Sequence, residues 1–260
     1  MGRETERRVR VGFFDFASCE GCQLQVLNLE NELAEILQHV EIVNFREAMS
    51  ERMDNYVVAF VEGSITRPSD IPRIKEIREK AEILVALGAC AVDGCVNANR
   101  NVLNVNDVRK TVYGDKADYF DVFDRVVPVS EVVGVDYEVE GCPIDRDEFL
   151  TVLESLLAGK KPHKASYPVC LECQIRENVC MYDLGEVCLG PIIRGGCKAR
   201  CPSNGFVCNG CRGVIKDSNL DRMREIMHEY GLKWSDISKK LELFNSWSLK
   251  EVEVGLLQRG

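Results

Sequence analysis

Thirteen cysteines are the feature that most limits what this chain of 260 residues can fold into. Only three histidines accompany them, and an odd number of thiols cannot be paired off completely into disulfides. Disulfides form in oxidising compartments, usually in proteins that carry a signal peptide. Residues 1–10 are strongly charged and no apolar signal segment follows them. We therefore expect a reduced, cytoplasmic protein whose cysteines serve metal or redox chemistry.

The rest of the composition is that of an ordinary globular protein. Hydrophobic residues make up 45% of the chain and charged residues 29%, which excludes wholesale disorder. The net charge of -9 argues against a nucleic-acid partner, because such partners are held mainly by positive charge. The longest apolar run, residues 83–92, is far shorter than the ~20 residues that span a bilayer, so we expect no membrane insertion.

The first part of the chain alternates strand-like and helix-like segments. Apolar runs predict buried strands over residues 9–16, 40–45, 56–61 and 83–87, with a fifth over 126–129 or 135–139. Helices are predicted over 23–38, after a cap at Ser69-Asp70, and over 145–157. This alternation predicts an α/β fold with a parallel, doubly wound sheet.

Four cysteines follow directly after predicted strands: Cys19, Cys22, Cys90 and Cys142. Sheets of this class bind their ligands outside the carboxyl ends of the strands. We therefore expect these four thiols to meet at one edge of the sheet, although they are far apart in the sequence.

The amino-acid composition of the chain changes after a linker-like stretch at residues 160–162. Eight cysteines fall between residues 170 and 211 among many glycines, with too little apolar material for a conventional core. We expect this segment to fold around its metals. The tail predicts one helix after Asp217 and another from about Ser235, which pack against the chain or a partner. The predicted domains are residues 1–160 and 161–260.

Iron–sulfur clusters and zinc compete as the metals. A [4Fe–4S] cluster takes four thiolates, and twelve of the thirteen cysteines divide into three sets of four, leaving Cys95 over. The pairs Cys170-x-x-Cys173 and Cys208-x-x-Cys211 also have the spacing of zinc-ribbon halves. The other cysteines stand at irregular intervals, and one set is split between strand ends. This pattern favours iron–sulfur clusters over zinc.

The motifs, taken together, resemble one known family. They are Ser18-Cys19-Glu20-Gly21-Cys22-Gln23, Val61-Glu62-Gly63-Ser64-Ile65, Gly88-Ala89-Cys90-Ala91, Glu140-Gly141-Cys142-Pro143, Pro168-Val169-Cys170-Leu171-Glu172-Cys173, Cys180-Met181-Tyr182-Asp183-Leu184-Gly185, Arg194-Gly195-Gly196-Cys197 and Cys208-Asn209-Gly210-Cys211-Arg212-Gly213. This pattern resembles the small subunit of [NiFe] hydrogenases. It is closest to the cytoplasmic members that couple hydrogen to NAD(P), coenzyme F420 or thiol–disulfide carriers.

The resemblance implies a flavodoxin-like N-terminal domain and three [4Fe–4S] clusters. The implied ligands are Cys19, Cys22, Cys90 and Cys142 for the proximal cluster, Cys197, Cys201, Cys208 and Cys211 for the medial cluster, and Cys170, Cys173, Cys180 and Cys188 for the distal cluster. Exported relatives carry a medial [3Fe–4S] cluster because one ligand position is not cysteine. The fourth thiol here, Cys201, predicts a complete [4Fe–4S] cluster.

The implied function is that of an electron-transfer subunit of a hydrogenase. A large subunit would carry the nickel–iron centre, with no nickel ligand from this chain. A further flavin or iron–sulfur subunit would exchange electrons with the distal cluster during H2 oxidation or evolution. Glu62, at the end of a predicted strand, is expected beside the proximal set, where it tunes the cluster, moves protons or is an ordinary interface carboxylate. Cys95 is expected to be a buried free thiol, with a role as an alternative proximal ligand left open.

Two other functions stay open at the level of the sequence. A complex-I-like redox subunit would share the flavodoxin-like domain, but such proteins typically have adjacent cysteines and lack a cysteine-rich C-terminal part. A zinc-stabilised interaction module would use the same thiols without sulfide.

Overall fold

The computed structural model describes residues 8–216 and 218–248. Most of the charged N-terminal segment that argued against export, and Asp217 in the tail, lie outside these ranges. Five strands form one sheet in the order β2-β1-β3-β4-β5: β1 (Val9–Asp15), β2 (Val40–Phe45), β3 (Val58–Glu62), β4 (Ile83–Leu87) and β5 (Tyr137–Val139). Every neighbouring pair is parallel. This is the flavodoxin-like strand order, so the predicted fold class is confirmed.

The fifth strand settles between the two predicted alternatives. It lies at Tyr137–Val139, within the second of them. The other stretch forms only an isolated bridge at Val127, and the helical turn η3 (Val129–Glu131) follows it. The side chain of Asn101 exchanges hydrogen bonds with the backbone of Val126, at 2.7 and 2.8 Å. These bonds satisfy backbone groups that a further strand would have used for pairing.

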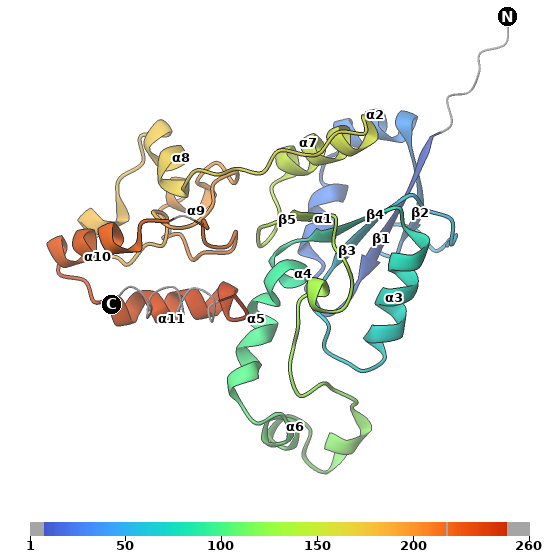
Figure 1. Cartoon of the computed structure of the whole chain (residues 1–260), viewed down its shortest axis with the longest axis horizontal. Coiled ribbons are helices and arrows are strands. Elements are labelled where there is room, and N and C mark those ends of the chain that lie inside the picture. Colours follow the sequence, from blue (N-terminus) through green and yellow to red (C-terminus); the bar gives the residue numbers. More distant parts are fainter. Residues whose placement is uncertain (1–7, 217, 249–260) are drawn as a thin grey trace, which may run out of the picture.

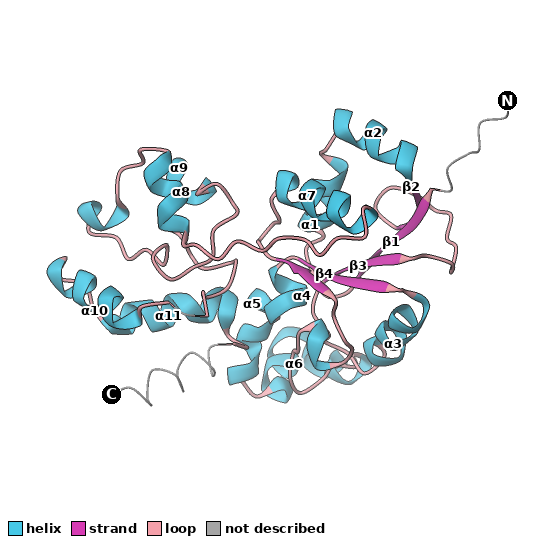
Figure 2. Ribbon diagram, turned by 45° about the horizontal axis from the view of Figure 1, so that its top comes forward, coloured by secondary structure: helices cyan, strands magenta, loops and turns pink. Residues whose placement is uncertain are grey.

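Helices cover both faces of the sheet (Figures 1 and 2). α1 (Gly21–Leu27), α2 (Asn31–His39) and α7 (Arg146–Leu157) lie over one face, where Val26 and Phe149 pack with Phe13 and Phe60 of the strands. α3 (Asp70–Lys80) covers the other face through its buried isoleucines. Strands buried on both sides need apolar residues at nearly every position, which explains their continuous apolar runs.

The helix expected over 23–38 is two helices. Glu30 has a positive φ of 47°, which interrupts the helical repeat between α1 and α2. The break lets Leu29 turn into the core, where 3% of it is exposed. The predicted cap at Ser69 makes no side-chain hydrogen bond. Asp145, in contrast, caps α7 by accepting bonds from two backbone N–H groups of the first turn.

A long excursion separates β4 from β5. It contains α4 (Ala89–Asp93), α5 (Cys95–Ala98), η1 (Asn99–Val102), α6 (Val105–Tyr113) and η2 (Gly114–Tyr119), and its far end projects away from the sheet (Figure 1).

The C-terminal region has a denser core than its sequence suggested. It contains α8 (Val169–Ile175), η4 (Met181–Leu184), α9 (Arg200–Ser203), α10 (Leu220–Glu229) and α11 (Trp234–Asn245). Leu189, Ile192 and Ile193 of the cysteine-rich segment are buried together with Met227 and Leu241 of the tail helices. The expectation of too little apolar material was therefore wrong, because the apolar faces of the tail helices complete the core. Among the described residues, no helix combines the length and apolar character that crossing a bilayer demands.

Candidate iron–sulfur sites

The carboxyl ends of the strands bring the segments of the proximal set together. Hydrogen bonds from Gly88 N–H to the Val139 carbonyl, at 2.7 Å, and from Ala89 N–H to the Gly141 carbonyl, at 2.8 Å, tie the Cys90 loop to the Cys142 loop. Gly88 has φ +84°, and a Cβ there would lie 2.3 Å from Cys22 Sγ. Only glycine leaves room for that sulfur, so the Cys22 thiol sits directly against the Cys90 loop.

Glu62 lies at this edge as expected, and the residue is 2% exposed. It accepts hydrogen bonds from the backbone N–H groups of Cys22, at 3.1 Å, and Gln23, at 3.0 Å. Both donors belong to the first turn of α1, where N–H groups have no partner within the helix. Burial raises the pKa of Glu62, and these two hydrogen bonds oppose that rise. Glu62 therefore anchors the turn that presents Cys22.

Cys95 is fully buried beside the proximal set. The Cys142 thiol lowers the pKa of Cys95, whereas the Cys90 thiol and burial raise it, and the net effect is a rise to about 12. Its backbone is left-handed, with φ 52°, at the junction between α4 and α5. The predicted burial of this thiol agrees with the structure, and its neighbours are two of the proposed proximal ligands.

The cysteines of the distal set lie on α8, directly before η4 and in the loop after η4. Burial, followed by the nearby thiols of Cys188, Cys173 and Cys180, raises the pKa of Cys170 to about 12. A Cβ at Gly190 would lie 3.1 Å from Cys170 Sγ and 3.5 Å from Cys188 Sγ, so this glycine leaves the space beside both sulfurs open. All four thiols of the set therefore face one region.

The medial set lies between the other two. Burial raises the pKa of Cys211 to about 12, and the nearby thiols of Cys197, Cys142 and Cys201 act in the same direction, against a backbone hydrogen bond from Cys142. At the opposite side, Cys208 N–H donates to Cys188 Sγ at 3.3 Å. The thirteen thiols are all free, and the three sets adjoin in the order proximal, medial, distal.

Glu172 is a residue of this region that the sequence analysis did not single out. It lies between Cys170 and Cys173 on α8, and its carboxylate accepts hydrogen bonds from the backbone N–H groups of Gly196, at 2.6 Å, and Ala199, at 3.0 Å. These donors flank Cys197. The position of this carboxylate inside a Cys-x-x-Cys motif was the sequence signal that could have identified it. Its hydrogen bonds hold α8, which carries two cysteines of the distal set, against the Cys197 segment of the medial set.

Within residues 8–216 and 218–248, no three His, Cys, Asp or Glu side chains gather tightly enough to hold a single metal ion. Four thiolates on one zinc ion, each about 2.3 Å from the metal, would lie close together. In a [4Fe–4S] cluster each thiolate binds a different iron, which spreads the sulfurs. The two kinds of site therefore differ in how far apart their sulfurs lie. His39, His163 and His228 are exposed.

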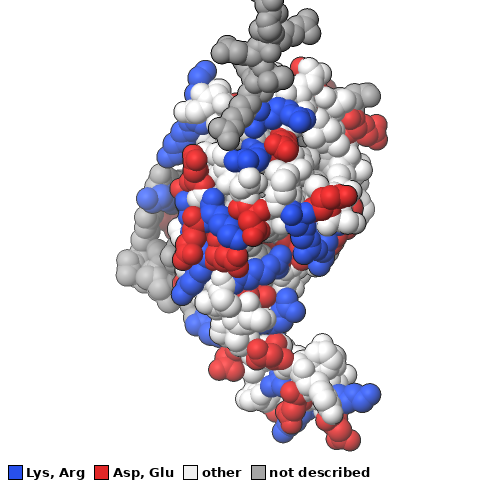
Figure 3. Space-filling model, turned by 90° about the vertical axis from the view of Figure 1, so that its right-hand side faces the viewer, with Lys and Arg blue, Asp and Glu red and all other residues white. Residues whose placement is uncertain are grey.

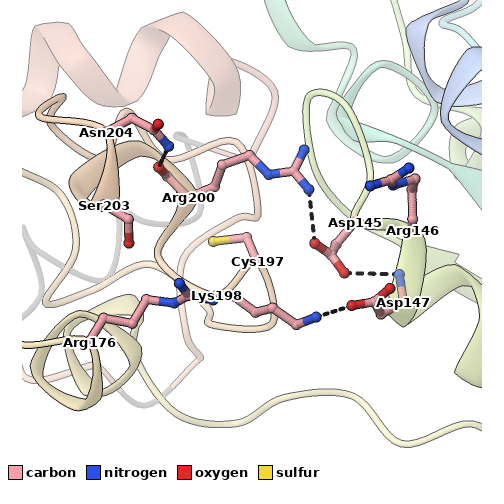
Figure 4. Close-up of a pocket in the computed structure, with 9 residues that line it drawn as sticks. All are labelled: Asp145, Arg146, Asp147, Arg176, Cys197, Lys198, Arg200, Ser203 and Asn204. Carbon is pink, nitrogen blue, oxygen red and sulfur yellow. Dashed lines mark hydrogen bonds and ion pairs between the residues drawn. The ribbon is translucent and has the colours of Figure 1, made fainter. Parts of the chain in front are cut away.

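Charged side chains line two surface pockets. One, of about 490 Å³, contains five basic and three acidic residues around Arg46 and Arg73, which both pair with Asp15. Lys and Arg lie among Asp and Glu over the face in Figure 3, with no continuous basic surface in this view. The other, of about 230 Å³, lies between the start of α7 and the Cys197 segment (Figure 4). There Arg200 pairs with Asp145 at 3.1 Å, and Lys198 pairs with Asp147.

Comparisons with known proteins agree with this geometry. The family model described as NADH ubiquinone oxidoreductase, 20 Kd subunit, matches residues 19–156. Sulfhydrogenase 2 subunit delta of Pyrococcus furiosus is 35% identical over 92% of this chain and 100% of its own length. A subunit of the F420-non-reducing hydrogenase vhu of Methanococcus voltae is 30% identical over 93% of this chain and 96% of its own length.

Two further relatives are shorter than this chain. The NAD-reducing hydrogenase HoxS subunit delta of Cupriavidus necator is 31% identical over 62% of this chain and 84% of its own length. A chain in the crystal structure of an NAD+-reducing [NiFe]-hydrogenase has 27% identity and a TM-score of 0.56, covering 60% of this chain and 95% of that chain. The chain belongs to the NADH:ubiquinone oxidoreductase 20 kDa subunit family, and within it to the small subunits of hydrogenases.

Proposed function

We propose that this chain is the electron-transfer subunit of a cytoplasmic [NiFe] hydrogenase, holding three [4Fe–4S] clusters between the nickel–iron site of a large subunit and a further flavin or iron–sulfur subunit. The observation that carries the proposal is the adjacency of the three cysteine sets: Cys211 of the medial set lies near Cys142 of the proximal set, and Cys208 N–H donates to Cys188 Sγ of the distal set at 3.3 Å. The clusters would supply one-electron storage and transfer.

The residues fit such clusters by their donor chemistry and by the space around them. We propose Cys19, Cys22, Cys90 and Cys142 as proximal ligands, Cys197, Cys201, Cys208 and Cys211 as medial ligands, and Cys170, Cys173, Cys180 and Cys188 as distal ligands. The glycines at positions 88 and 190 leave room next to the sulfurs of Cys22 and Cys170. The chain's own contribution is to place these thiolates, exclude water around them and donate backbone N–H groups.

The length of the relatives supports two parts within the chain. The NAD-reducing relatives cover only about 60% of it, whereas the sulfhydrogenase and F420-non-reducing relatives cover 92% and 93%. We place the proximal cluster in a domain of residues 1–160 and the other two in residues 161–260.

Co-purification tests the proposal. A tagged chain, purified anaerobically from its native host, should bring down a nickel-containing large subunit and a flavin or iron–sulfur subunit. The complex should reduce a viologen dye with H2. Cys173→Ser should slow dye reduction by the complex, while the exposed Ser203→Ala should leave it unchanged. Purification with quinone-reducing subunits and no H2-dependent dye reduction would instead indicate a complex-I-like role.

A further inference from the structure

The side chain of Arg212 is a buried cation between the medial and the proximal cysteine sets. It is 1% exposed and directly follows Cys211 in the chain. We propose that Arg212 is a positioning residue, whose guanidinium fixes the medial cysteine set against the proximal set. This inference rests on the proposed function, because it assigns the two sets to clusters.

Arg212 uses its donors on three separate segments. Nε donates to the Gly195 carbonyl at 2.7 Å, and Nη1 donates to the Glu140 carbonyl at 2.8 Å. Both terminal nitrogens donate to the carboxylate of Glu148 on α7, each at 2.6 Å. Such a bidentate pair between a guanidinium and a carboxylate fixes the orientation of the two groups as well as their distance.

The two carbonyl acceptors lie next to cysteines of different sets. Glu140 lies two residues before Cys142, and Gly195 lies two residues before Cys197. One planar group therefore joins the backbone beside a proximal cysteine to the backbone beside a medial cysteine, while its own chain carries Cys211. Backbone acceptors cannot rotate away as side chains do, so the guanidinium sets the spacing of the segments.

The surroundings are shaped for this arginine. Gly196 has φ +107°, and a Cβ there would lie 2.4 Å from Arg212 Nη2. The carboxylate of Glu140 is held by Lys164 at 2.6 Å and Arg194 at 3.3 Å, and its second oxygen lies 4.0 Å from Arg212 Nη2. Because the carboxylates of Glu140 and Glu148 face the guanidinium, its positive charge is neutralised locally. What Arg212 adds beyond charge is therefore the fixed geometry of its hydrogen-bond donors.

A matched control exists on the same boundary. Arg200 also crosses from the cysteine-rich segment to the start of α7, where it pairs with Asp145 at 3.1 Å (Figure 4). Its side chain is 48% exposed, against 1% for Arg212, so solvent screens its charge, although the carboxylate of Asp145 is buried. Arg200→Met therefore removes an arginine–carboxylate ion pair across the same boundary but leaves the buried bidentate pair of Arg212 with Glu148 intact.

The test compares Arg212→Lys and Glu148→Gln with Arg200→Met in the anaerobically purified complex. Iron and sulfide per chain, the EPR spectrum of the fully reduced clusters, and hydrogen–deuterium exchange of residues 140–148 and 194–213 are measured. Lysine keeps the charge but cannot bridge the carboxylate and both carbonyls. Glutamine keeps the shape of residue 148 but offers the fork a single acceptor.

We expect Arg212→Lys to keep the wild-type iron content but to change the EPR splitting that magnetic coupling between the reduced proximal and medial clusters produces. Exchange in both segments should rise at least tenfold, with Glu148→Gln intermediate and Arg200→Met unchanged. Wild-type splitting and exchange in Arg212→Lys would overturn the proposal. Absence of iron and sulfide from the wild-type chain would instead overturn the proposed function, and the exchange data would still test the clamp.

Discussion

The carboxylate of Glu62 at the end of β3 accepts a hydrogen bond from the backbone N–H of Cys22, at 3.1 Å. A strand end thereby holds the helical turn of a proposed cluster ligand that lies forty residues away in the chain. The same carboxylate takes the neighbouring N–H of Gln23 at 3.0 Å. Glu62 thus completes the start of α1, which has no side-chain cap from residue 20.

Glu62→Gln should weaken this turn. The amide oxygen can accept one of the two bonds, and the amide nitrogen then faces the other N–H group. We expect unfolding to require about 1–3 kcal/mol less free energy, the cost of an unsatisfied buried group. A chelator should also remove iron faster from this variant. Glu51→Gln, at an exposed position, is the control; equal iron retention in both variants would contradict the role of Glu62.

Cys201→Ser should convert the proposed medial [4Fe–4S] cluster into a [3Fe–4S] cluster. Cys201 lies on α9 within reach of Cys211, and it supplies the fourth thiol of the medial set. Loss of one thiolate ligand favours a three-iron cluster. The variant, purified anaerobically, should show a [3Fe–4S] EPR signal as isolated. An EPR spectrum identical to that of the wild type would remove Cys201 from the ligand set.

Cys95→Ala should leave the iron content unchanged. Its thiol is buried against Cys142 and Cys90, so removal leaves a small cavity that lowers the unfolding free energy by about 1 kcal/mol. Cys90→Ala, in contrast, should lose the proximal iron. If Cys95→Ala loses as much iron as Cys90→Ala, then Cys95 is itself a ligand.

The attachment of the C-terminal helix should depend on pH. Asp93 accepts hydrogen bonds from the backbone N–H groups of Trp247, at 3.1 Å, and Ser248, at 3.3 Å. Burial, as the largest effect, raises the pKa of Asp93 from 3.8 to about 6 against these hydrogen bonds. The folded state therefore holds this proton more tightly than the unfolded chain, and stability falls as pH rises towards 6.

Asp93→Asn should remove this pH dependence. Between pH 5 and pH 7 the wild type should lose about 1–2 kcal/mol of stability relative to the variant, with no further change above pH 7. Thermal unfolding under anaerobic conditions across this range provides the measurement. A constant difference between the two proteins at every pH would show that Asp93 does not titrate there.

The sheet was predictable because its strands carry an unambiguous signal. β2 and β4 have the predicted bounds. For β4 the reason is that it is buried at four of its five positions, and a strand buried on both faces needs a continuous apolar run. The position of Glu62 at the sheet edge followed from the same reasoning, because parallel strands end together. The burial of Cys95, the thiol left over from the three sets of four, was also expected.

The failures have a common physical origin in long-range contacts. The break at Glu30 depends on how Leu29 meets the core, and the C-terminal core depends on tail helices that return to the cysteine-rich segment. Arg212 and Glu148 were missed because a buried ion pair across 64 positions leaves no local pattern. Their side chains read as ordinary surface charges until the fold brings them together.

Iron, acid-labile sulfide and zinc in the anaerobically purified chain test the central claim most directly. Three [4Fe–4S] clusters predict about twelve iron atoms and about twelve sulfides per chain, with no stoichiometric zinc. Zinc without sulfide would contradict the proposal and point to a zinc-stabilised module. About four irons per chain would contradict the assignment of two clusters to residues 161–260.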